Sequence, residues 1–462
     1  MRPRLLLVLL FLGALAARLC HVDILWVEEC YPAAAAIQFL HGKVPYRDFW
    51  FDKPPLSALV YLLWGAQVGW LLRLAGALFV TLASWLLYRF ARERWGEREG
   101  VGAACLTAFF VTFGVPSAVM ALAPDLLLLV PHAAAVYLAW RGRPLWAGLA
   151  AGVSGLLHTK GLLVLVACLL WQCRAWRPLA AGFALPNLAM LAWLGSAGAI
   201  PGYLEQVWRW GFLYSRDTFV EAPVLEGVRR TANWAGFHAT LVLAAAWYWW
   251  RERDADARRF AVWLLISLVA VAAGWRFFPR YYFHLLPVMV LVGARGFVLL
   301  GRKGALAAML LLLAPLARFG PRYVMLAGGA QEWSDLAMYE GSREAAHVVK
   351  QAARPGDTLL VWGYRPDIFV ETRLAAGTPF LDSQPLTGVI ADRHLVDVRP
   401  SAPELARENR QRLVETAPTF VVDGLGPYNP PLAITAYPEL QAWLSKYDEI
   451  ARLPTAVVYR LK

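Results

Sequence analysis

The sequence predicts a polytopic α-helical membrane protein that carries a small α/β domain at its C-terminal end. Hydrophobic residues make up 59% of the chain and charged residues only 17%, whereas soluble domains contain about 25% charged residues. Apolar runs recur through residues 1–319, and their length suits a hydrocarbon core about 30 Å thick. From residue 320 onward, short helical and strand patterns alternate, which is typical of an α/β domain.

The distribution of positive charge predicts the topology. Lys and Arg gather in short clusters between apolar runs, at residues 2–4, 89–98, 141–143, 174–177, 251–259 and 302–303. The positive-inside rule places all of these clusters in the cytoplasm. Two crossings fit between neighbouring clusters and one follows the last, which predicts about eleven transmembrane helices. The N-terminus is then cytoplasmic and the C-terminal domain extracytoplasmic, in the cell (inner) membrane.

Membrane orientation therefore explains the net charge of +12 better than nucleic acid does, so membrane lipids and no nucleic acid are the expected partners. The N-terminus has signal-peptide features, with Ala14-Leu15-Ala16 as a candidate cleavage site. A retained first helix is favoured, because the apolar character continues to Trp26. Two passes within 145–173 are short for full spans, so a re-entrant hairpin is the alternative there. The five cysteines lie in or beside apolar segments and are predicted to be core thiols without disulfides.

The predicted domains are a membrane domain at 1–319, with a first outer loop at 22–70, and an extracytoplasmic domain at 320–462. Helices are predicted at 341–353, 401–415 and 438–447, and strands at 357–363, 418–423 and 455–461. Ser401 is expected to cap the second of these helices. The domain contains no GxGxxG, P-loop or zinc spacing, so it is predicted to serve recognition or scaffolding.

The first outer loop is unusually rich in charged and aromatic residues. Between Glu28 and Pro55 it contains four carboxylates, three basic residues and several aromatic residues, including Glu28, Glu29, Tyr31, Tyr46, Arg47, Asp48, Asp52 and Lys53. An interfacial aromatic belt is the purely structural alternative. The density of carboxylates beside aromatic residues favours a functional site.

Three later segments place polar residues on the same predicted outer face. They are Pro124-Asp125, His158-Thr159-Lys160, and Trp275–His284 with Arg276, Arg280 and Tyr282. Helix capping, a snorkelling lysine and an interfacial anchor are the respective structural alternatives. Basic residues outside run against the topology rule, and a lipid phosphate would explain them. Carboxylates to deprotonate a hydroxyl and cations to stabilise a leaving phosphate are what transfer of a sugar from a lipid phosphate requires.

Taken in order, these motifs resemble those of the GT-C glycosyltransferases, especially the branch of lipid A aminoarabinose transferases and protein O-mannosyltransferases. The resemblance covers about residues 1–320, and the order of the motifs makes it specific. The matching segments are Glu28-Glu29, Gly42–Tyr46 with Asp52–Pro55, Pro124-Asp125, Thr159–Gly161, and Arg276–Tyr282 before Leu286-Pro287.

The resemblance implies a polyprenyl-phosphate-sugar donor, inverting transfer to an extracytoplasmic lipid, glycan or protein acceptor, and a first-loop carboxylate as the base. The family's acidic pair has an aromatic residue four positions after its Asp, whereas Tyr31 stands three after Glu28, so Glu28 and Glu29 both remain candidates. A divalent metal ion, which some members use, also stays open. The predicted site comprises catalytic Glu28, Glu29 and Asp125; donor-phosphate-binding Lys53, Arg276, Arg280 and Lys160; and further candidates Tyr31, Tyr46, Asp52, His158 and Tyr282.

Other functions fit parts of the pattern. A transporter or flippase of a lipid-linked sugar would usually show internal repeats and polar sites near the midplane, which this sequence lacks. A non-catalytic cell-envelope assembly protein or receptor would use the C-terminal domain for binding. The segment 199–235, with its tyrosines, tryptophans and arginines, is predicted to be an outer loop that forms an acceptor wall, or else an aromatic belt.

Overall fold

The structure, a computed structural model, describes residues 3–217, 220–330 and 333–462 and divides into two compact units. The helical unit comprises Met1–Asp23, Gly69–Leu191 and Val220–Ala330, and the mixed unit comprises Ile24–Val68, Ala192–Phe219 and Gln331–Lys462. Ile24–Val68, which we call the first outer segment after the predicted loop, thus belongs to the same unit as the C-terminal domain.

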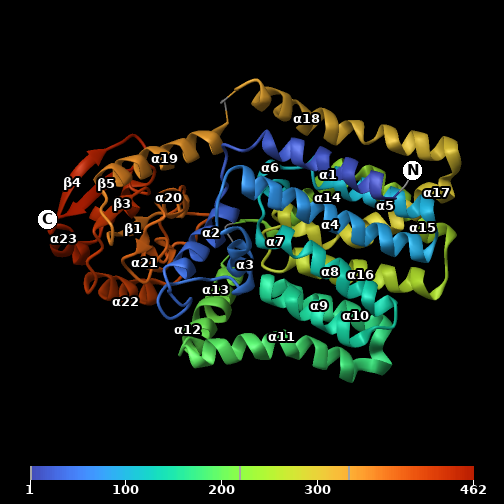
Figure 1. The fold of residues 1–462 in the computed structure, drawn as a ribbon, viewed down its shortest axis with the longest axis horizontal. Helices are drawn as coiled ribbons and strands as arrows, with labels where there is room; N and C mark the ends of the chain where they lie inside the picture. Colours follow the sequence, from blue (N-terminus) through green and yellow to red (C-terminus); the bar gives the residue numbers. More distant parts are fainter. Residues whose placement is uncertain (1–2, 218–219, 331–332) are drawn as a thin grey trace. The chain divides into compact units, whose positions relative to one another are not determined.

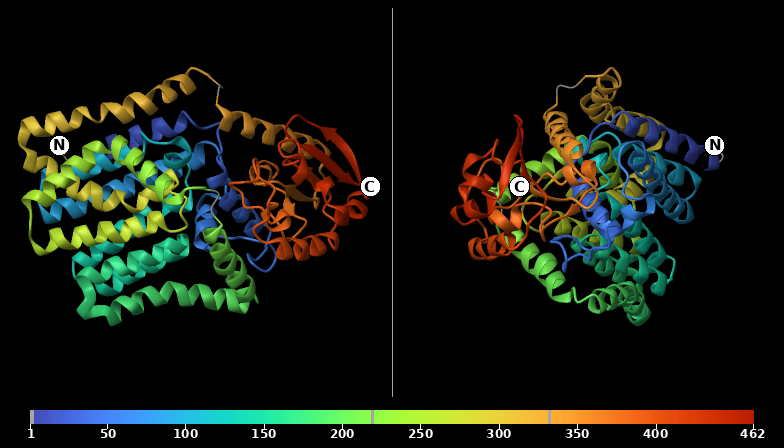
Figure 2. Two further views of the ribbon diagram at one scale, coloured as in Figure 1. Left: turned by 180° about the vertical axis from the view of Figure 1, so that it is seen from behind. Right: turned by 60° about the vertical axis from the view of Figure 1, so that its left-hand side comes forward.

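The helical unit is built from long helices that run side by side (Figures 1 and 2). The long helices are α1 Pro3–Leu19, α4 Trp70–Arg94, α5 Glu97–Phe110, α8 Leu129–Trp140, α9 Pro144–Leu157, α10 Leu162–Gln172, α11 Trp176–Ser196, α14 Pro223–Phe237, α15 Ala239–Arg251, α16 Ala255–Ala272, α17 Leu286–Leu310 and α18 Leu313–Ala327. Short turns connect them: α6 Pro116–Val119, α7 Pro124–Leu127 and the 3₁₀ segments η2 Thr159–Gly161, η3 Cys173–Ala175 and η5 Pro279–His284.

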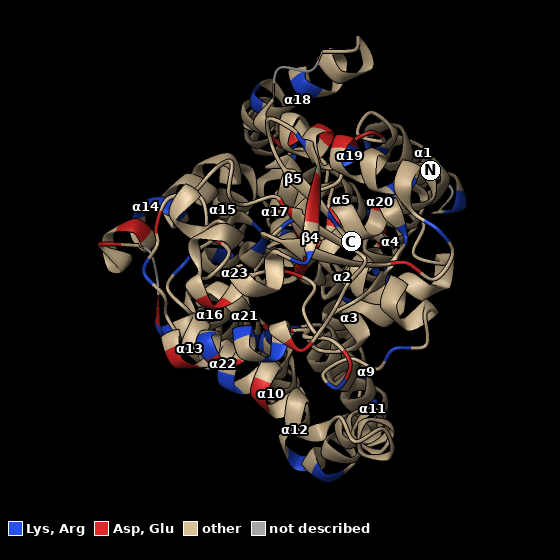
Figure 3. Cartoon of the chain, turned by 90° about the vertical axis from the view of Figure 1, so that its left-hand side faces the viewer, with Lys and Arg blue, Asp and Glu red and all other residues tan. Residues whose placement is uncertain are grey.

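Small residues allow these helices to approach closely. A Cβ atom at Gly296 of α17 would lie 1.9 Å from the carbonyl oxygen of Ala244 in α15, so only glycine fits there. Such contacts are typical of membrane helix packing, where lipid provides no hydrophobic drive for association. Figure 3 shows that most of the helical ribbon carries no charged residue.

Two helical stretches of the described chain, Trp70–Arg94 and Thr159–Ser196, are long and apolar enough to cross a membrane. A third crossing results if α17 and α18, which are bent by 42°, form one span. The helices at 124–140 and 144–157 are apolar but shorter. The apolar helical architecture is thus confirmed, while the number of eleven crossings and the orientation stay predictions.

The mixed unit joins helices to a five-stranded sheet of order β2-β1-β3-β5-β4. Strands β2, β1 and β3 are parallel, and β5 pairs antiparallel with both β3 and β4. The strands are β1 Thr358–Trp362, β2 Ala375–Ala376, β3 Phe420–Asp423, β4 Tyr447–Arg452 and β5 Val457–Leu461. The helices are α2 Val27–Leu40, α3 Leu56–Leu59, η1 Val60–Trp64, α12 Ile200–Tyr203, the π-helix η4 Leu204–Arg209, α13 Trp210–Arg216, α19 Ser334–Ala352, α20 Asp367–Thr372, α21 Gln384–Thr387, α22 Pro403–Val414, η6 Pro430–Leu432, η7 Ile434–Ala436 and α23 Pro438–Leu444.

One hydrophobic core joins three distant parts of the chain in this unit. It contains Trp50 of the first outer segment, Trp210 of α13 and Trp362 of β1, all nearly inaccessible to solvent. Burying large aromatic side chains contributes strongly to such a core. The C-terminal sheet and the first outer segment therefore form one packed body.

The predicted helices and strands of the C-terminal domain are confirmed as α19, α22, α23, β1, β3 and β5. Three predictions were wrong in detail. Ser401 does not cap α22, whose N-cap is Ala402, because its hydroxyl bonds instead to Asp217 and Arg393. The segment 199–235 is largely helical rather than a loop. Cys105 and Cys173 are exposed on helix surfaces rather than in the core, which a thiol tolerates because it behaves as a small hydrophobic group.

Candidate functional site

The acidic pair of the first outer segment lies in the first turn of α2. Glu29 is fully buried, and its Oε1 accepts a hydrogen bond of 3.3 Å from the backbone N–H of Trp26, the N-cap residue. Such a bond satisfies one of the unpaired N–H groups at a helix start. Glu29 therefore has a structural role, whereas Glu28 does not make this cap and is only partly buried.

The chain then turns sharply around Tyr46 to present Asp52 and Lys53. Tyr46 adopts a left-handed backbone conformation with φ of 66°, which costs energy for a residue with a side chain. Its hydroxyl donates to the carbonyl oxygen of Lys53 at 2.7 Å, and its own carbonyl accepts from Gln206 at 3.0 Å. A Cβ atom at Gly202 would lie 2.1 Å from that same carbonyl, so α12 can approach this turn only with glycine there.

Asp52 and Lys53 form an ion pair at 3.2 Å beside several tyrosines. The backbone N–H of Asp52 donates to the Tyr31 hydroxyl at 3.4 Å. The Lys53 ammonium lies 5.9 Å from the ring centroid of Tyr214 in α13. Lys53 keeps about a third of its side chain exposed, so it can contact a ligand while Asp52 holds it. We call Tyr31, Asp52, Lys53 and Tyr214 the first-loop cluster.

A second group of predicted residues meets in the helical unit, where α7 packs on η5 and side chains of η2 and its N-cap reach both of them. Asp125 is buried, and its two carboxylate oxygens lie 3.4 Å from His158 Nε2 and 3.4 Å from Arg280 Nε. His158 Nδ1 accepts from the backbone N–H of Lys160 at 3.1 Å. Its proton therefore lies on Nε2, directed at Asp125. We call Asp125, His158, Lys160, Arg276 and Arg280 the cationic cluster.

The ammonium of Lys160 is the least satisfied group of this cluster. Its nitrogen is buried and forms no hydrogen bond within the described chain. It lies 3.4 Å from the ring centroid of Tyr281, a cation–π contact, and interacts electrostatically with Asp125, Arg276 and Arg280. Burying a charged group without hydrogen bonds is costly, so an anionic ligand would stabilise it.

The backbone around Arg276 is strained. Trp275 and Phe277, on either side of it, have φ of 54° and 48°, the left-handed region that residues with side chains rarely adopt. Arg276 itself is buried, and its carbonyl oxygen accepts from Arg230 at 2.6 Å. Strain of this kind gathers at ligand sites, where the surrounding structure maintains it.

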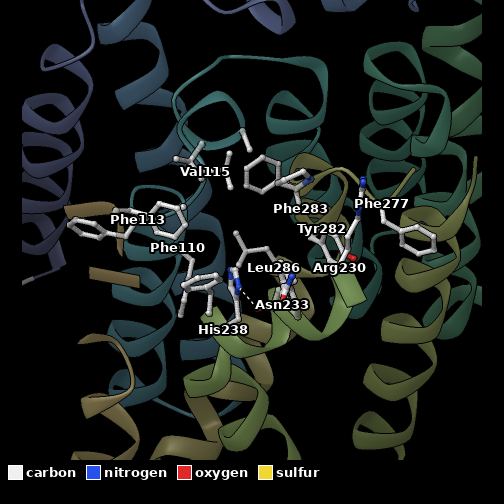
Figure 4. A pocket seen from close by; sticks show the side chains of 17 residues that line it. Phe110, Phe113, Val115, Arg230, Asn233, His238, Phe277, Tyr282, Phe283 and Leu286 are labelled. Atoms are coloured by element: carbon white, nitrogen blue, oxygen red, sulfur yellow. Dashed lines mark hydrogen bonds between the residues drawn. The ribbon is translucent and has the colours of Figure 1, made fainter. Parts of the chain in front are cut away.

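An aromatic pocket lies next to this strained segment in the helical unit. It has a volume of about 300 Å³ and is lined mainly by apolar side chains of α5, α14, η5 and α18. Figure 4 shows Phe110, Phe113 and Phe283 around it, with Arg230 and Asn233 among its polar residues. Such an apolar cavity with few polar groups is typical of a small-molecule or lipid site.

The predicted site residues are divided between the two units. Lys53, Asp52, Tyr31 and Tyr46 belong to the mixed unit, and Asp125, His158, Lys160, Arg276, Arg280 and Tyr282 to the helical unit. Tyr282 donates to or accepts from Thr231 at 2.9 Å and stacks on Trp234, so it lines the aromatic pocket. No group of three or more His, Cys, Asp or Glu in the described ranges is arranged to hold a metal ion.

Sequence reasoning missed several residues that lie beside these clusters. Tyr281 holds the Lys160 ammonium, and His284 lies against His158 with ring centroids 6.3 Å apart. Both lie in Trp275–His284, so the aromatic and basic residues of that segment were the signal that could have revealed them. Tyr364 and Asp382, from the C-terminal domain, lie near the first-loop cluster, and no sequence motif marks them.

Asp382 provides a test of the mixed unit that is independent of activity. Burial, and the negative charge of Asp52, raise the pKa of Asp382 to about 7, although Lys53 opposes the shift. Between about pH 4 and pH 7 the folded chain thus keeps a proton that the unfolded chain loses, so stability falls as the pH rises. We expect wild type to lose up to about 4 kcal/mol relative to Asp382→Asn across this window. Thermal midpoints of both proteins at pH 4.5, 6 and 7.5 would measure this, and a constant difference would contradict it.

The comparisons with known proteins agree with the geometry. Residues 52–196 match the family model described as dolichyl-phosphate-mannose-protein mannosyltransferase. No curated protein matches the sequence. The structure of ArnT from Cupriavidus metallidurans bound to undecaprenyl phosphate superposes with a TM-score of 0.61 and 15% identity, over 98% of this chain and 97% of that one. ArnT in its apo state gives a TM-score of 0.60 and 16% identity, over the same shares.

This chain therefore has the fold of a GT-C glycosyltransferase. At such identities the likeness to ArnT establishes the fold, and the family model adds a sequence match that begins at Asp52 of the first-loop cluster. The resemblance to the GT-C glycosyltransferases that the sequence predicted is confirmed.

Proposed function

We propose that this protein is a membrane glycosyltransferase that moves a sugar from a polyprenyl-phosphate-linked donor to an extracytoplasmic acceptor, with inversion. The observation that carries the proposal is the buried Lys160 ammonium, which lacks a hydrogen-bond partner in the described chain and lies beside Arg276 and Arg280. A lipid phosphate supplies the anion that such a set of cations requires. The match to a mannosyltransferase model and the ArnT-like fold support the same reaction.

In the proposed reaction, a hydroxyl of the acceptor attacks the anomeric carbon on the face opposite the phosphate. Glu28 accepts the hydroxyl proton as general base. The bond between the anomeric carbon and the phosphate oxygen breaks, and its electron pair stays on the phosphate. Lys160, Arg276 and Arg280 of the cationic cluster compensate the charge that develops on the departing phosphate. Lys53, the other cation of the predicted site, is a second candidate for a phosphate contact.

The aromatic pocket supports a lipid-linked donor. It shares Phe277, Pro279 and Tyr282 with the segment that contains Arg276 and Arg280, and most of its lining is apolar. An isoprenoid chain attached to a phosphate would bury apolar surface there, at roughly 25 cal/mol per Å². ArnT has been solved with undecaprenyl phosphate, so a polyprenyl phosphate is the first donor lipid to test.

The proposal is tested by sugar transfer with the purified protein in sealed proteoliposomes. Undecaprenyl-phosphate-linked glucose, mannose and aminoarabinose are supplied with a membrane lipid extract, and release of undecaprenyl phosphate is measured. Sugar transfer to an acceptor supports a glycosyltransferase. Movement of the lipid-linked sugar between leaflets without bond cleavage supports a flippase instead and contradicts the proposal.

Removing the charge of Asp125 is expected to slow transfer about tenfold, because Asp125 positions His158 and Arg280. Asp125→Asn preserves the size of the side chain, so the thermal midpoint should change little. Steady-state transfer rates with the donor found above would measure the effect. Full activity of this variant would remove Asp125 from the proposed machinery.

A further inference from the structure

We infer that the C-terminal α/β domain supplies a wall of the sugar-binding site, in which Tyr364 contacts the donor sugar ring and Asp382 positions the Asp52–Lys53 pair. The inference rests on the proposed function and deepens it, because it assigns the sugar to the first-loop cluster and the C-terminal domain. The ligand class is a pyranose or furanose ring with several hydroxyl groups.

The sheet topology places both residues where α/β domains bind ligands. Strands β2, β1 and β3 are parallel, so their carboxyl ends lie at the same edge of the sheet. Tyr364 stands two residues after the end of β1, and the segment leading to Asp382 follows β2. In open sheets of this kind, ligands bind just outside the carboxyl ends of the strands.

The first outer segment lies at this same edge. The backbone N–H of Trp50 donates to the carbonyl oxygen of Pro379 at 2.7 Å, in the segment between β2 and Asp382. Gly363 N–H donates to Ser383 Oγ at 2.9 Å, which ties the residue before Tyr364 to the residue after Asp382. Two loops at this edge are therefore bonded to each other, and one of them also to the first outer segment.

Three tyrosines from three parts of the chain surround the Asp52–Lys53 pair. The Tyr364 and Tyr31 rings lie 5.6 Å apart between centroids, and Tyr214 approaches Lys53 from α13. Tyr364 and Tyr214 are partly exposed and Tyr31 is buried, so the first two can present their rings to a ligand while the third supports them from below the surface. Tyrosine rings offer flat apolar faces for the C–H groups of a sugar, together with hydroxyls for its polar edge.

Asp382 adds a second carboxylate to this group of residues. It is buried, its Oδ1 accepts from the backbone N–H of Gln384 at 2.7 Å, and it interacts electrostatically with Asp52 and Lys53. Carboxylate oxygens accept hydrogen bonds from hydroxyl groups. Carboxylate oxygens and tyrosine hydroxyls together suit the hydroxyl groups of the donor's sugar ring.

The test compares a lipid phosphate with and without its sugar. Binding of undecaprenyl phosphate, and of undecaprenyl-phosphate-linked glucose, mannose and aminoarabinose, is measured by microscale thermophoresis on the full-length protein in nanodiscs. Tyr364→Ala is expected to weaken binding of the preferred sugar-linked lipid about tenfold and to leave binding of undecaprenyl phosphate unchanged. Tyr364→Phe keeps the ring and should retain most of the affinity.

Asp382→Asn preserves the shape and the bond to Gln384, and it is expected to raise the KM for the donor about fivefold while kcat changes less than about twofold. Asp448→Asn, an exposed carboxylate of β4 in the same domain, is the matched control and should behave as wild type. A purely structural role of Asp382 would instead lower the thermal midpoint without this split between KM and kcat.

The outcomes separate this inference from the proposed function. If wild type prefers a sugar-linked lipid and transfers its sugar, but Tyr364→Ala and Asp382→Asn retain that preference, only the inference is overturned. If Tyr364→Ala weakens binding of undecaprenyl phosphate and of the sugar-linked lipid equally, the inference is also overturned, because the Tyr364 ring would then not contact the sugar. If wild type binds no sugar-linked lipid better than undecaprenyl phosphate and transfers no sugar, both the inference and the proposed function are overturned.

Discussion

Glu28→Gln is expected to lose about 10³-fold or more of its transfer rate while keeping its fold. A positioned general base contributes about 10²–10⁴-fold to a reaction of this kind, and glutamine has the same shape but cannot accept the hydroxyl proton. Glu28 lies in the first turn of α2, but it is Glu29 that bonds to the N-cap residue Trp26. The substitution of Glu28 therefore leaves this bond intact. The purified variant would be assayed for transfer and for its thermal midpoint beside wild type.

Glu29→Gln is the matched control for this experiment. Glu29 is buried and bonds to the backbone N–H of Trp26, and a glutamine side-chain oxygen can accept the same bond. We expect this variant to lose stability by about 1 kcal/mol and to retain most of its transfer rate. The reverse pattern, with Glu29→Gln inactive and Glu28→Gln active, would assign the base to Glu29. Full activity in both would remove the base from this pair.

The sequence predicts those elements of the fold that a local pattern of residues marks. The apolar helices, β1, β3 and β5 are marked by continuous hydrophobic runs, which local pattern alone detects. β4 was missed because it is an edge strand with Asp448, Glu449 and Arg452 exposed, a composition that protects sheet edges from pairing. The π-helix and α13 were missed because their charged and aromatic residues resemble an interfacial loop.

Some of the candidate site residues are likewise marked by local motifs, and others are not. The residues of the cationic cluster stand in short motifs with a chemical reason for their spacing, so they were predicted. Tyr364 and Asp382 lie more than 300 positions from Tyr31 and Asp52 in the chain, and only the packing of α2 and the first outer segment on the sheet brings them together. Long-range packing of this kind leaves no local pattern. The bond from the Trp26 backbone N–H to Glu29, which distinguishes Glu29 from Glu28 in the structure, is likewise a property of the folded helix start.

Lys160→Met is expected to lower transfer by about 10²–10³-fold while leaving the thermal midpoint unchanged or raised. The Lys160 ammonium is buried without a hydrogen bond in the described chain, and replacing a buried charge by an apolar side chain of similar length is often neutral or stabilising. The loss of rate follows because a fixed cation that stabilises a leaving group contributes about this much. Residues that lower the stability of the folded protein but accelerate its reaction are common at functional sites.

Two measurements separate this explanation from a structural one. Binding of undecaprenyl phosphate should weaken in Lys160→Met, because the anion loses one of its cationic contacts. Arg302→Met, an exposed basic residue of α17, should change neither binding nor transfer. If Lys160 only anchors the start of α10 through its contact with the Tyr281 ring, the variant would instead lose thermal stability and keep its affinity for the lipid phosphate. That result would leave Arg276 and Arg280, with Lys53, as the candidates for the phosphate contact.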